Sequence, residues 1–438
     1  MPSSEVRLKS ADGTPWVVPW QRSDRLTAAR LLSIMPGMTM LRIQHPLEGF
    51  RILDLSRVLA GPYCTMMLGD LGAEVIKVER PGVGDDTRAW GPPFAEGESA
   101  YYLCANRNKK SITVNLKSPA GQEIIRQLAR TSDVLVENYK VGELAALGLG
   151  YDDLKPLNPG LVYCSITGYG QTGPDKDLPG YDFVIQGRGG VMSITGEPDG
   201  EPMKVGVAVV DITAGLYAAN AIQAALLARS KTGRGQAIDI ALLDAQVAWL
   251  ANVGSNYLVS GDAPSRFGNA HPTIVPYQSF RAREGFFCLA VGNDGQWQKL
   301  CALLNQPELA QDPRFTTNPA RVQHREILVP LLQALFHAQE IDFWLEEIAG
   351  AGIPCGPVQT IDQVFTDPQV LARDMIWMMP HPTAGEVSLV GSPLKLSETP
   401  VAARLPPPLL GEHTAEVLTT MLGYTTDDIT RLRTENAI

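Results

Sequence analysis

The chain has 438 residues, 45% of them hydrophobic, and a formal net charge of −10 at pH 7 with a pI near 5.2. This length and apolar content suffice for two or three globular domains. The acidic balance argues against nucleic acid or a membrane surface as the main partner, so a polyanionic ligand would have to meet local cations.

Residues 1–45 form an N-terminal extension that differs in composition from the rest of the chain. They lack β patterning and carry arginines in RSDRLTAARLLSIM, but also acidic residues, which transit peptides avoid. We expect a disordered, transit-like or mis-started segment, with Met35, Met38 and Met40 as alternative starts. No signal peptide opens the chain and no apolar run reaches the length of a membrane span, so we expect a soluble protein. The scattered cysteines indicate an intracellular one, with the cytoplasm as the expected location and the mitochondrial matrix as the alternative.

From Phe50 onward, nearly continuous apolar strands alternate with helices. One helix lies within 61–72, and another begins at Pro119 with Ser118 as its N-cap. The expected strands are 51–55, 73–79, 111–116, 134–138 and 161–166. Such strands predict a parallel sheet covered by helices on both faces, which is a Rossmann-like α/β domain.

A further strand is expected at 205–210, followed by an almost wholly apolar helix that begins at Ile212. So much small apolar surface implies deep burial or a helix held by another chain. After residue 262, a hairpin over 277–291 and polar-faced helices predict a second, smaller α+β domain. A last helix is expected from Thr414.

The stretch SITGYGQTGP places Gly168, Gly170 and Gly173 in the pattern G-x-G-x-x-G after an apolar strand. In a dinucleotide-binding fold this turn opens a helix whose N-terminus holds the pyrophosphate. Here PDKDLPGYD follows, and its prolines and glycine favour turns. We therefore interpret these glycines as a strand-to-loop exit and not as a nicotinamide-nucleotide site.

Common catalytic motifs are missing from the sequence. It contains no G-x-S-x-G, no G-x-x-x-x-G-K-[ST] and no H-E-x-x-H, and its isolated histidines do not support a metal site. Carboxylate chemistry remains. Asp211 is expected at the start of the apolar helix, where a helix N-terminus favours an anion, although an aspartate there is more often a plain N-cap. Asp182, and likewise Lys77 and Arg80 at a strand end, could be simple solvated charges.

Several collinear segments together resemble the class III coenzyme A transferases of the CaiB/BaiF type. This family includes formyl-CoA transferase and, as a divergent branch, α-methylacyl-CoA racemase. The resemblance extends over nearly the whole chain from Leu47, through RVLAGPYCTMMLGDLGAEVIKVERPGVGDDTR, NRNKKSITVNLKSPAG, VVDITAGLYA, KTGRGQAIDIALLDAQ, AGIPCGP and PPLLGEHT. Within the family, GDDTRAWGPP, SITGYGQTGP and HPTIVPYQSF are most similar to members that act on succinyl-CoA and glutarate.

The resemblance implies transfer of CoA from an acyl-CoA, expected to be succinyl-CoA, to a dicarboxylate such as glutarate. Asp211 would be the nucleophile, forming a mixed anhydride and then an aspartyl-CoA thioester, and Asp182 would line the active site. Two alternatives are a racemase that exchanges an α-proton and a non-catalytic CoA-binding relative. Racemases of the family place a His-Asp pair where this chain has Tyr181 and Asp182, and a phenol is a poor base at neutral pH.

For CoA itself, the resemblance points to Val58, Leu59, Ala60, Arg80, Asn138, Tyr139 and Leu147. Cations that formyl-CoA transferase uses correspond to Ala146 and Pro179 here, so Lys140 or Lys110 is expected to compensate.

The acyl substrate is expected to meet a second set of residues. Trp90 would form a wall of the acyl pocket, and Arg88, Arg107 or His271 would bind a distal carboxylate, although each also has a purely structural alternative. The glycine-rich loop of formyl-CoA transferase is replaced by residues 268–278.

The family also implies an interlaced homodimer. Its large domain would comprise residues 46–262 and 375–438, with the small domain of residues 263–374 inserted. We expect no permanently bound cofactor and no metal, CoA thioesters and carboxylic acids as substrates, and neither nucleic acid nor a membrane as partner.

Overall fold

The computed structural model describes residues 5–9, 15–19 and 44–438, and the chain divides into two compact units, 1–44 and 45–438. In the first unit, β1 (Glu5–Lys9) pairs antiparallel with β2 (Pro15–Pro19). The sequence analysis did not predict this hairpin. The three alternative start residues lie outside the described residues.

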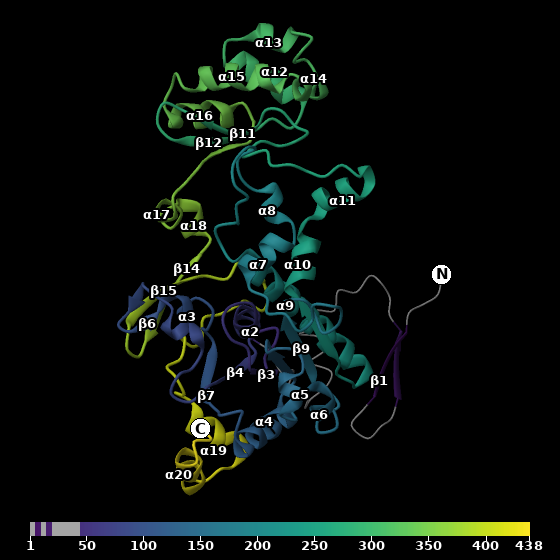
Figure 1. Cartoon of the computed structure of the whole chain (residues 1–438), viewed down its shortest axis with the longest axis vertical. Helices are drawn as coiled ribbons and strands as arrows, with labels where there is room; N and C mark the ends of the chain where they lie inside the picture. Colours follow the sequence, from purple (N-terminus) through teal and green to yellow (C-terminus); the bar gives the residue numbers. More distant parts are fainter. Residues whose placement is uncertain (1–4, 10–14, 20–43) are drawn as a thin grey trace. The chain divides into compact units, whose positions relative to one another are not determined.

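The second unit contains a six-stranded sheet in which all neighbouring strands are parallel (Figure 1). Its order is β10-β9-β8-β3-β4-β7, the order of a doubly wound Rossmann sheet, so the predicted parallel α/β sheet is confirmed. The strands are β3 (Arg51–Asp54), β4 (Glu74–Glu79), β7 (Lys109–Thr113), β8 (Val134–Glu137), β9 (Val162–Thr167) and β10 (Ala237–Ala241). The order reverses between β3 and β8, and such sheets bind ligands at the carboxyl ends of the strands that flank this reversal.

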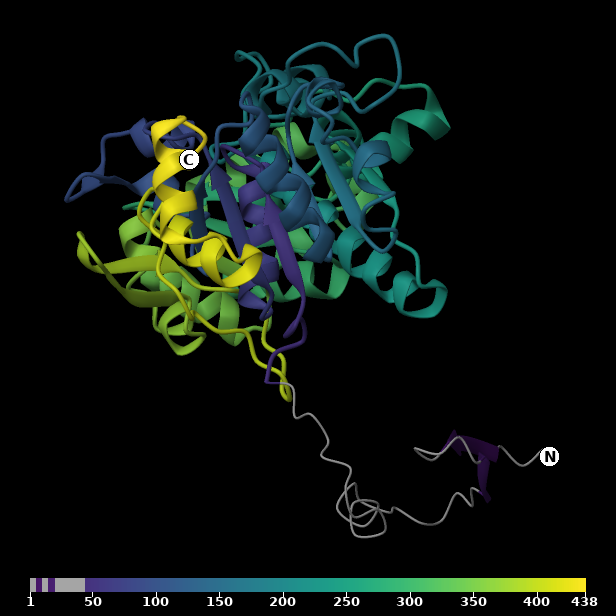
Figure 2. The same cartoon turned by 90° about the horizontal axis from the view of Figure 1, so that it is seen from below.

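Helices cover both faces of the sheet because alternate strand residues point to opposite sides. Ile52 packs in the core formed with α2 (Ala60–Asp70), α7 (Asp182–Arg188), α9 (Val209–Thr232) and α10 (Leu242–Trp249). Leu53 packs in the opposite core with α4 (Pro119–Thr131), α19 (Thr414–Leu422) and α20 (Thr426–Thr434). Figure 2 shows α19 and α20, in yellow, beside the strands. Ser118 caps α4 as predicted, accepting a hydrogen bond from the amide of Gly121 at 3.0 Å.

The predicted strand at 205–210 is wrong, because α9 already begins at Val209 and no strand precedes it. The amide of Val205 donates to the side chain of Gln186 at 2.8 Å, so its hydrogen bond goes to a side chain and not to a neighbouring strand. Val207 is 58% exposed, although its β-branched side chain is typical of a buried strand. The apolar segment is therefore a loop that leads into the helix.

Contrary to expectation, one helix within the described residues, α9, is long and apolar enough by length and composition to cross a membrane. Its buried residues, among them Ala214, Ala218 and Ile222, belong to the same core as β3 and β9. Packing against the sheet and α2 therefore accounts for the apolar character of that face. Leu216, Tyr217 and Leu227 on the same helix are exposed.

A separate antiparallel sheet, β11-β12-β13, has its own core around Phe280, Trp297 and Phe336. It confirms the predicted hairpin, with β11 (Tyr277–Arg281), β12 (Phe286–Ala290) and β13 (Cys355–Pro357). Its helices are α12 (Asp294–Leu303), α13 (Pro307–Gln311), α14 (Asn318–Gln323), α15 (Arg325–Phe336) and α16 (Ile341–Gly350).

The remaining elements are short. They are η1 (Asp86–Ala89), β5 (Phe94–Ala95), β6 (Glu98–Ser99), α3 (Ala100–Leu103), α5 (Glu143–Ala146), α6 (Tyr151–Leu154), α8 (Val191–Ile194), α11 (Ala251–Ser260), α17 (Ile361–Val364), α18 (Pro368–Ala372), β14 (Ile376–His381) and β15 (Gly385–Val390). The C-terminal segment returns to the edge strand β7, where Asn108 donates to Leu405 and His413 donates to Ser111. Just beyond the strand, the amide of Asn115 donates to Ala437.

Candidate active site

The turn after β3 lies where the strand order reverses. This turn leads from Ser56 into α2. The side chain of Asn138, which follows the neighbouring strand β8, makes hydrogen bonds to its backbone. The Asn138 amide oxygen accepts from the Arg57 amide at 2.9 Å, and its nitrogen donates to the Arg57 carbonyl at 2.7 Å. The fold therefore brings the predicted CoA residues of both strands together at its ligand-binding edge.

Asp211 is the third residue of α9 and does not occupy the N-cap position, which belongs to Ala208. Asp182, the first residue of α7, supplies the capping oxygen instead. Its Oδ2 accepts from the amides of Val210 at 2.8 Å and Asp211 at 3.4 Å. The other oxygen, Oδ1, accepts from the buried Gln186 side chain at 2.6 Å. Two predicted carboxylates thus meet at one helix N-terminus, and one of them holds the backbone of the other.

Burial raises the pKa of Asp211 to about 7, and the charge of Asp182 adds to the rise. Burial also raises the pKa of Tyr101 to about 12, with the charges of Asp211 and Asp182 contributing. The Tyr101 ring packs edge-to-face against Trp90 with centroids 5.1 Å apart. The predicted wall residue Trp90 therefore stands against a tyrosine whose hydroxyl is within electrostatic reach of both carboxylates.

Two adjoining cavities run along this edge of the sheet. One, of about 750 Å³, contains Asp211 and is lined by Val58, Leu59, Ala60 and Asn138. The other, of about 690 Å³, is lined by Arg80, Leu147 and Lys117. Both share Arg57, Tyr139 and Glu143.

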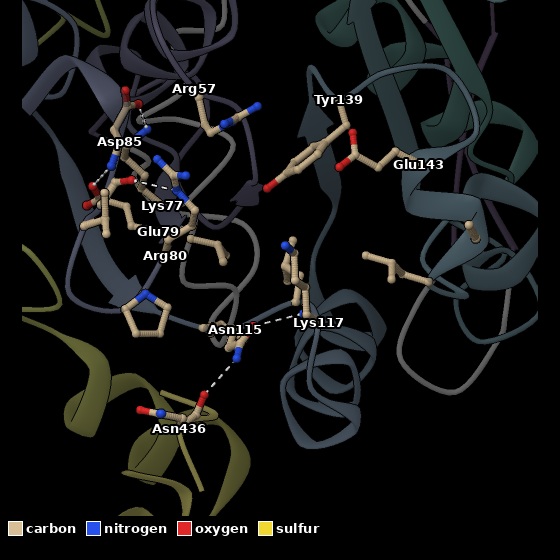
Figure 3. A pocket seen from close by; sticks show the side chains of 18 residues that line it. Arg57, Lys77, Glu79, Arg80, Asp85, Asn115, Lys117, Tyr139, Glu143 and Asn436 are labelled. Atoms are coloured by element: carbon tan, nitrogen blue, oxygen red, sulfur yellow. Dashed lines mark hydrogen bonds and ion pairs between the residues drawn. The ribbon is translucent and has the colours of Figure 1, made fainter.

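Figure 3 shows the second cavity. Arg57 and Arg80 lie on one side, Tyr139 and Glu143 on the other, and Lys117 between them. Together the two cavities form an extended site with Arg80 and Lys117 toward one end and the Asp211 carboxylate at the other.

The cations predicted for a distal carboxylate lie elsewhere. Arg88 makes two 2.8 Å hydrogen bonds to the buried Glu79, and Arg107 is 3% exposed and paired with Asp70 at 2.7 Å. Neither lines the cavity with Asp211. His271 is partly buried in the loop before β11, with its ring against Tyr277.

Lys140 and Lys110, the two lysines expected to replace the missing CoA-binding cations, lie in different places. Lys140 lines the cavity that contains Asp211. Lys110 pairs with Glu74 at 3.2 Å and Glu416 at 2.9 Å and lines neither cavity. The charge of Lys110 is therefore neutralised outside the site.

The first glycine after β9, Gly168, has a packing role. A Cβ atom at Gly168 would lie 2.6 Å from the Cα of Gly180, so the two ends of the intervening loop cross at a distance that only glycines permit. No helix begins between these residues, which agrees with the rejection of a nicotinamide-nucleotide site. Tyr181 and Asp182 follow directly after this crossing.

A second close approach joins the two helices of the site. A Cβ atom at Gly215 would lie 2.7 Å from the carbonyl oxygen of Ala60. Gly215 is one helical turn after Asp211, so its lack of a side chain lets the second turn of α9 approach the first turn of α2.

Sequence reasoning missed four residues of this arrangement: Arg57, Lys117, Tyr101 and Gln186. Arg57 immediately precedes the predicted turn, and Lys117 follows the strand SITVNL, so position relative to strand ends was a usable signal for both. Gln186 lies four residues after Asp182 on α7, so helical spacing was a usable signal for it. Tyr101 carries no such signal, because only the tertiary structure brings it near the carboxylates.

Comparison with known proteins defines the class: residues 47–414 match the model of CoA-transferase family III, so the chain belongs to this family of enzymes. Among its relatives, succinyl-CoA:glutarate CoA-transferase of Mus musculus is 50% identical over 387 residues, covering 88% of this chain and 89% of that protein. Succinate–glutarate CoA-transferase of Agrobacterium fabrum is 50% identical over 379 residues, covering 85% and 95%. A CAIB/BAIF family protein from Brucella suis has a similar crystal structure, with a TM-score of 0.79, 47% identity, and coverage of 86% of this chain and 100% of that one.

Proposed function

We propose that this CoA-transferase moves CoA from succinyl-CoA to glutarate, with Asp211 as the nucleophile. The single observation that carries the proposal is the placement of Asp211 at the N-terminus of α9, in the same cavity as the start of α2. Two relatives that are about half identical over most of their length are named for succinate and glutarate.

In the proposed reaction, a carboxylate oxygen of Asp211 attacks the thioester carbonyl of succinyl-CoA. The C–S bond breaks, giving a succinyl-aspartyl anhydride and CoA thiolate. The thiolate attacks the aspartyl carbonyl, releasing succinate and leaving an aspartyl-CoA thioester. Glutarate then attacks this thioester to give a second anhydride, and CoA thiolate attacks its glutaryl carbonyl, which forms glutaryl-CoA and frees Asp211. Free amides at the start of α2 would stabilise the oxyanions, an effect worth about 3 kcal/mol per donor in other enzymes.

The extended site suits a CoA thioester. We propose that the predicted residues Val58, Leu59, Ala60, Arg80, Asn138, Tyr139 and Leu147 bind CoA, together with Arg57 and Lys117, because all of them line the two adjoining cavities. The phosphates would lie at the end with Arg80 and Lys117 and the thioester at Asp211. Arg88 and Arg107 are already paired with buried carboxylates, so His271, which lines neither cavity, is the remaining candidate for the distal carboxylate.

Intact-mass measurement after mixing with succinyl-CoA tests the proposed chemistry. A CoA adduct, converted by hydroxylamine to a hydroxamate that maps to Asp211, is expected in the native enzyme and not in Asp211→Ala. Subsequent addition of glutarate should remove the adduct and yield glutaryl-CoA. A native protein that binds succinyl-CoA and forms no adduct contradicts the mechanism.

We also propose that the enzyme is an interlaced homodimer. No residue of α11 is buried, and Leu258 and Val259 are 82% and 89% exposed. Such an apolar helix is typical of a surface that a second subunit covers. Light scattering should give the dimer mass for the native protein and the monomer mass for Leu258→Glu/Val259→Glu; a native monomer would contradict the proposal.

The cellular location stays a proposal. We place the enzyme in the cytoplasm, with the mitochondrial matrix as the alternative if residues 1–45 act as a transit peptide. Imaging of the full chain and of a chain that begins at Met40 would separate the two, because only a transit peptide makes their locations differ.

A further inference from the structure

The backbone of the turn between β3 and α2 is held in an unfavourable conformation. Val58 has φ of +71°, in the left-handed region that β-branched residues avoid. Such a conformation persists only where surrounding contacts impose it, and it often marks a functional turn. Val58 directly precedes Leu59, the N-cap of α2, which makes no side-chain capping hydrogen bond.

The buried ion pair of Lys77 and Asp85 makes hydrogen bonds to the backbone of this turn on both sides of Arg57. The Asp85 carboxylate accepts from the amide of Val58, with both oxygens 3.3 Å from the nitrogen. Lys77 donates to Asp85 at 2.9 Å and to the carbonyl of Ser56 at 3.0 Å. Lys77 is fully buried and Asp85 is 2% exposed, so the pair is shielded from solvent.

We propose that Asp85 is a positioning residue of this enzyme, which, with Lys77, holds Val58 in the left-handed conformation and so aims the start of α2 at the acyl-CoA thioester. Asp85 and Lys77 line the adjoining cavity, whereas Val58, Leu59 and Ala60 line the cavity with Asp211. On the Asp211 cavity, Asp85 therefore acts through the backbone of the turn. The inference rests on the proposed function, because it assumes that an acyl-CoA occupies this cavity.

The test uses a glycine at position 58, which adopts a left-handed φ without strain. Asp85→Asn is expected to lower kcat/KM for succinyl-CoA at least tenfold, with KM for glutarate unchanged. Adding Val58→Gly in that background should restore most of the loss, and Val58→Gly alone, which removes the same side chain from the cavity, is the reference for this double variant.

Asp133 provides a matched control at the opposite end of the same sheet. It too accepts from a backbone amide, that of Arg51 at 2.8 Å, and pairs with a cation, Arg229, at 2.7 Å. Asp133→Asn is expected to lower the thermal midpoint and leave kcat/KM unchanged. Should Asp85→Asn fail to fold, Lys77→Met/Asp85→Leu, which leaves no unpaired buried charge, carries the same test with and without the glycine.

Equal activity with and without the glycine in the Asp85 variants overturns the inference, as does an equal loss for Asp133→Asn. Calorimetric titration of the native enzyme with CoA, together with its transfer activity, tells whether the positioning role of Asp85 or the proposed function is wrong. If native protein binds CoA and transfers it, but the variants do not respond as expected, only the inference fails. If native protein shows no transfer, the proposed function fails first.

Discussion

The carboxylate of Asp182 accepts a hydrogen bond from the backbone amide of Asp211 while its charge raises the pKa of the Asp211 side chain. The same group therefore holds the proposed nucleophile in place and opposes its ionisation. Asp182 can do both because its own charge is satisfied by two helix amides and by Gln186.

The first prediction concerns the pH dependence of the rate. The nucleophile must be ionised, and the pKa of Asp211 is about 7, so kcat/KM should fall about tenfold per pH unit below that value and level off above it. Asp182→Asn keeps a hydrogen-bond acceptor and removes the charge, and should shift the rise to lower pH. Measurement of kcat/KM from pH 5 to 9 in both proteins checks this; superimposable profiles would count against the coupling.

The second prediction concerns stability. A carboxyl whose folded-state pKa lies above its unfolded value of 3.8 destabilises the fold as pH rises from about 4 to 7, and the penalty is constant above that range. Asp211→Asn should therefore be more stable than the native protein at pH 8, by roughly 2–4 kcal/mol, and about equally stable at pH 4. Denaturant titration at the two pH values measures this. A loss of stability at pH 8 would show that Asp211 makes a stabilising contact.

The third prediction concerns the contact of α9 with α2. Gly215→Ala would bring a methyl group to 2.7 Å from the Ala60 carbonyl oxygen, a backbone atom that cannot move away alone. We expect a destabilisation of about 1–3 kcal/mol and a lower kcat, because the helices that carry the two halves of the site are pushed apart. Gly350→Ala, which adds a methyl group in open space on α16, is the control and should leave kcat unchanged. A native kcat for Gly215→Ala contradicts the prediction.

The fourth prediction separates two lysines. Lys117 lines the cavity with Arg80 and Lys110 does not, although the sequence pointed to Lys140 or Lys110. Lys117→Ala should raise KM for succinyl-CoA about tenfold, the usual effect of losing a charge-assisted hydrogen bond to a phosphate. Lys110→Ala should leave KM unchanged. Steady-state kinetics of both variants measure these KM values. A raised KM in Lys110→Ala with an unchanged KM in Lys117→Ala would place the phosphate site at Lys110.

The fifth prediction concerns the distal carboxylate. If His271 binds it, His271→Gln should raise KM for both succinyl-CoA and glutarate severalfold. Butyryl-CoA and valerate, which lack that carboxylate, should be unaffected. A uniform change across all four substrates would assign His271 a structural role in its loop.

The sequence was informative where a pattern depends on neighbouring residues. The Ser118 cap, the alternating strands and the position of Asp211 near a helix start follow from local chemistry. The apolar run at 205–210 misled because its composition fits a strand, while its backbone partner, Gln186, lies on another helix. Similarly, nothing in the local pattern shows that Arg88 and Arg107 are each paired with a buried carboxylate of another element. Partners brought together only by folding cannot be predicted from neighbouring residues.

The late residues of the chain complete the cavity with Arg80. Asn436 lines it, and its carbonyl accepts from Asn115 at 3.0 Å, across 321 positions of sequence. During synthesis, all six strands of the parallel sheet emerge long before residue 436. The sheet and α9 can therefore form while this side of the cavity is still missing, and we expect acyl-CoA to bind only after the C-terminal residues have been made.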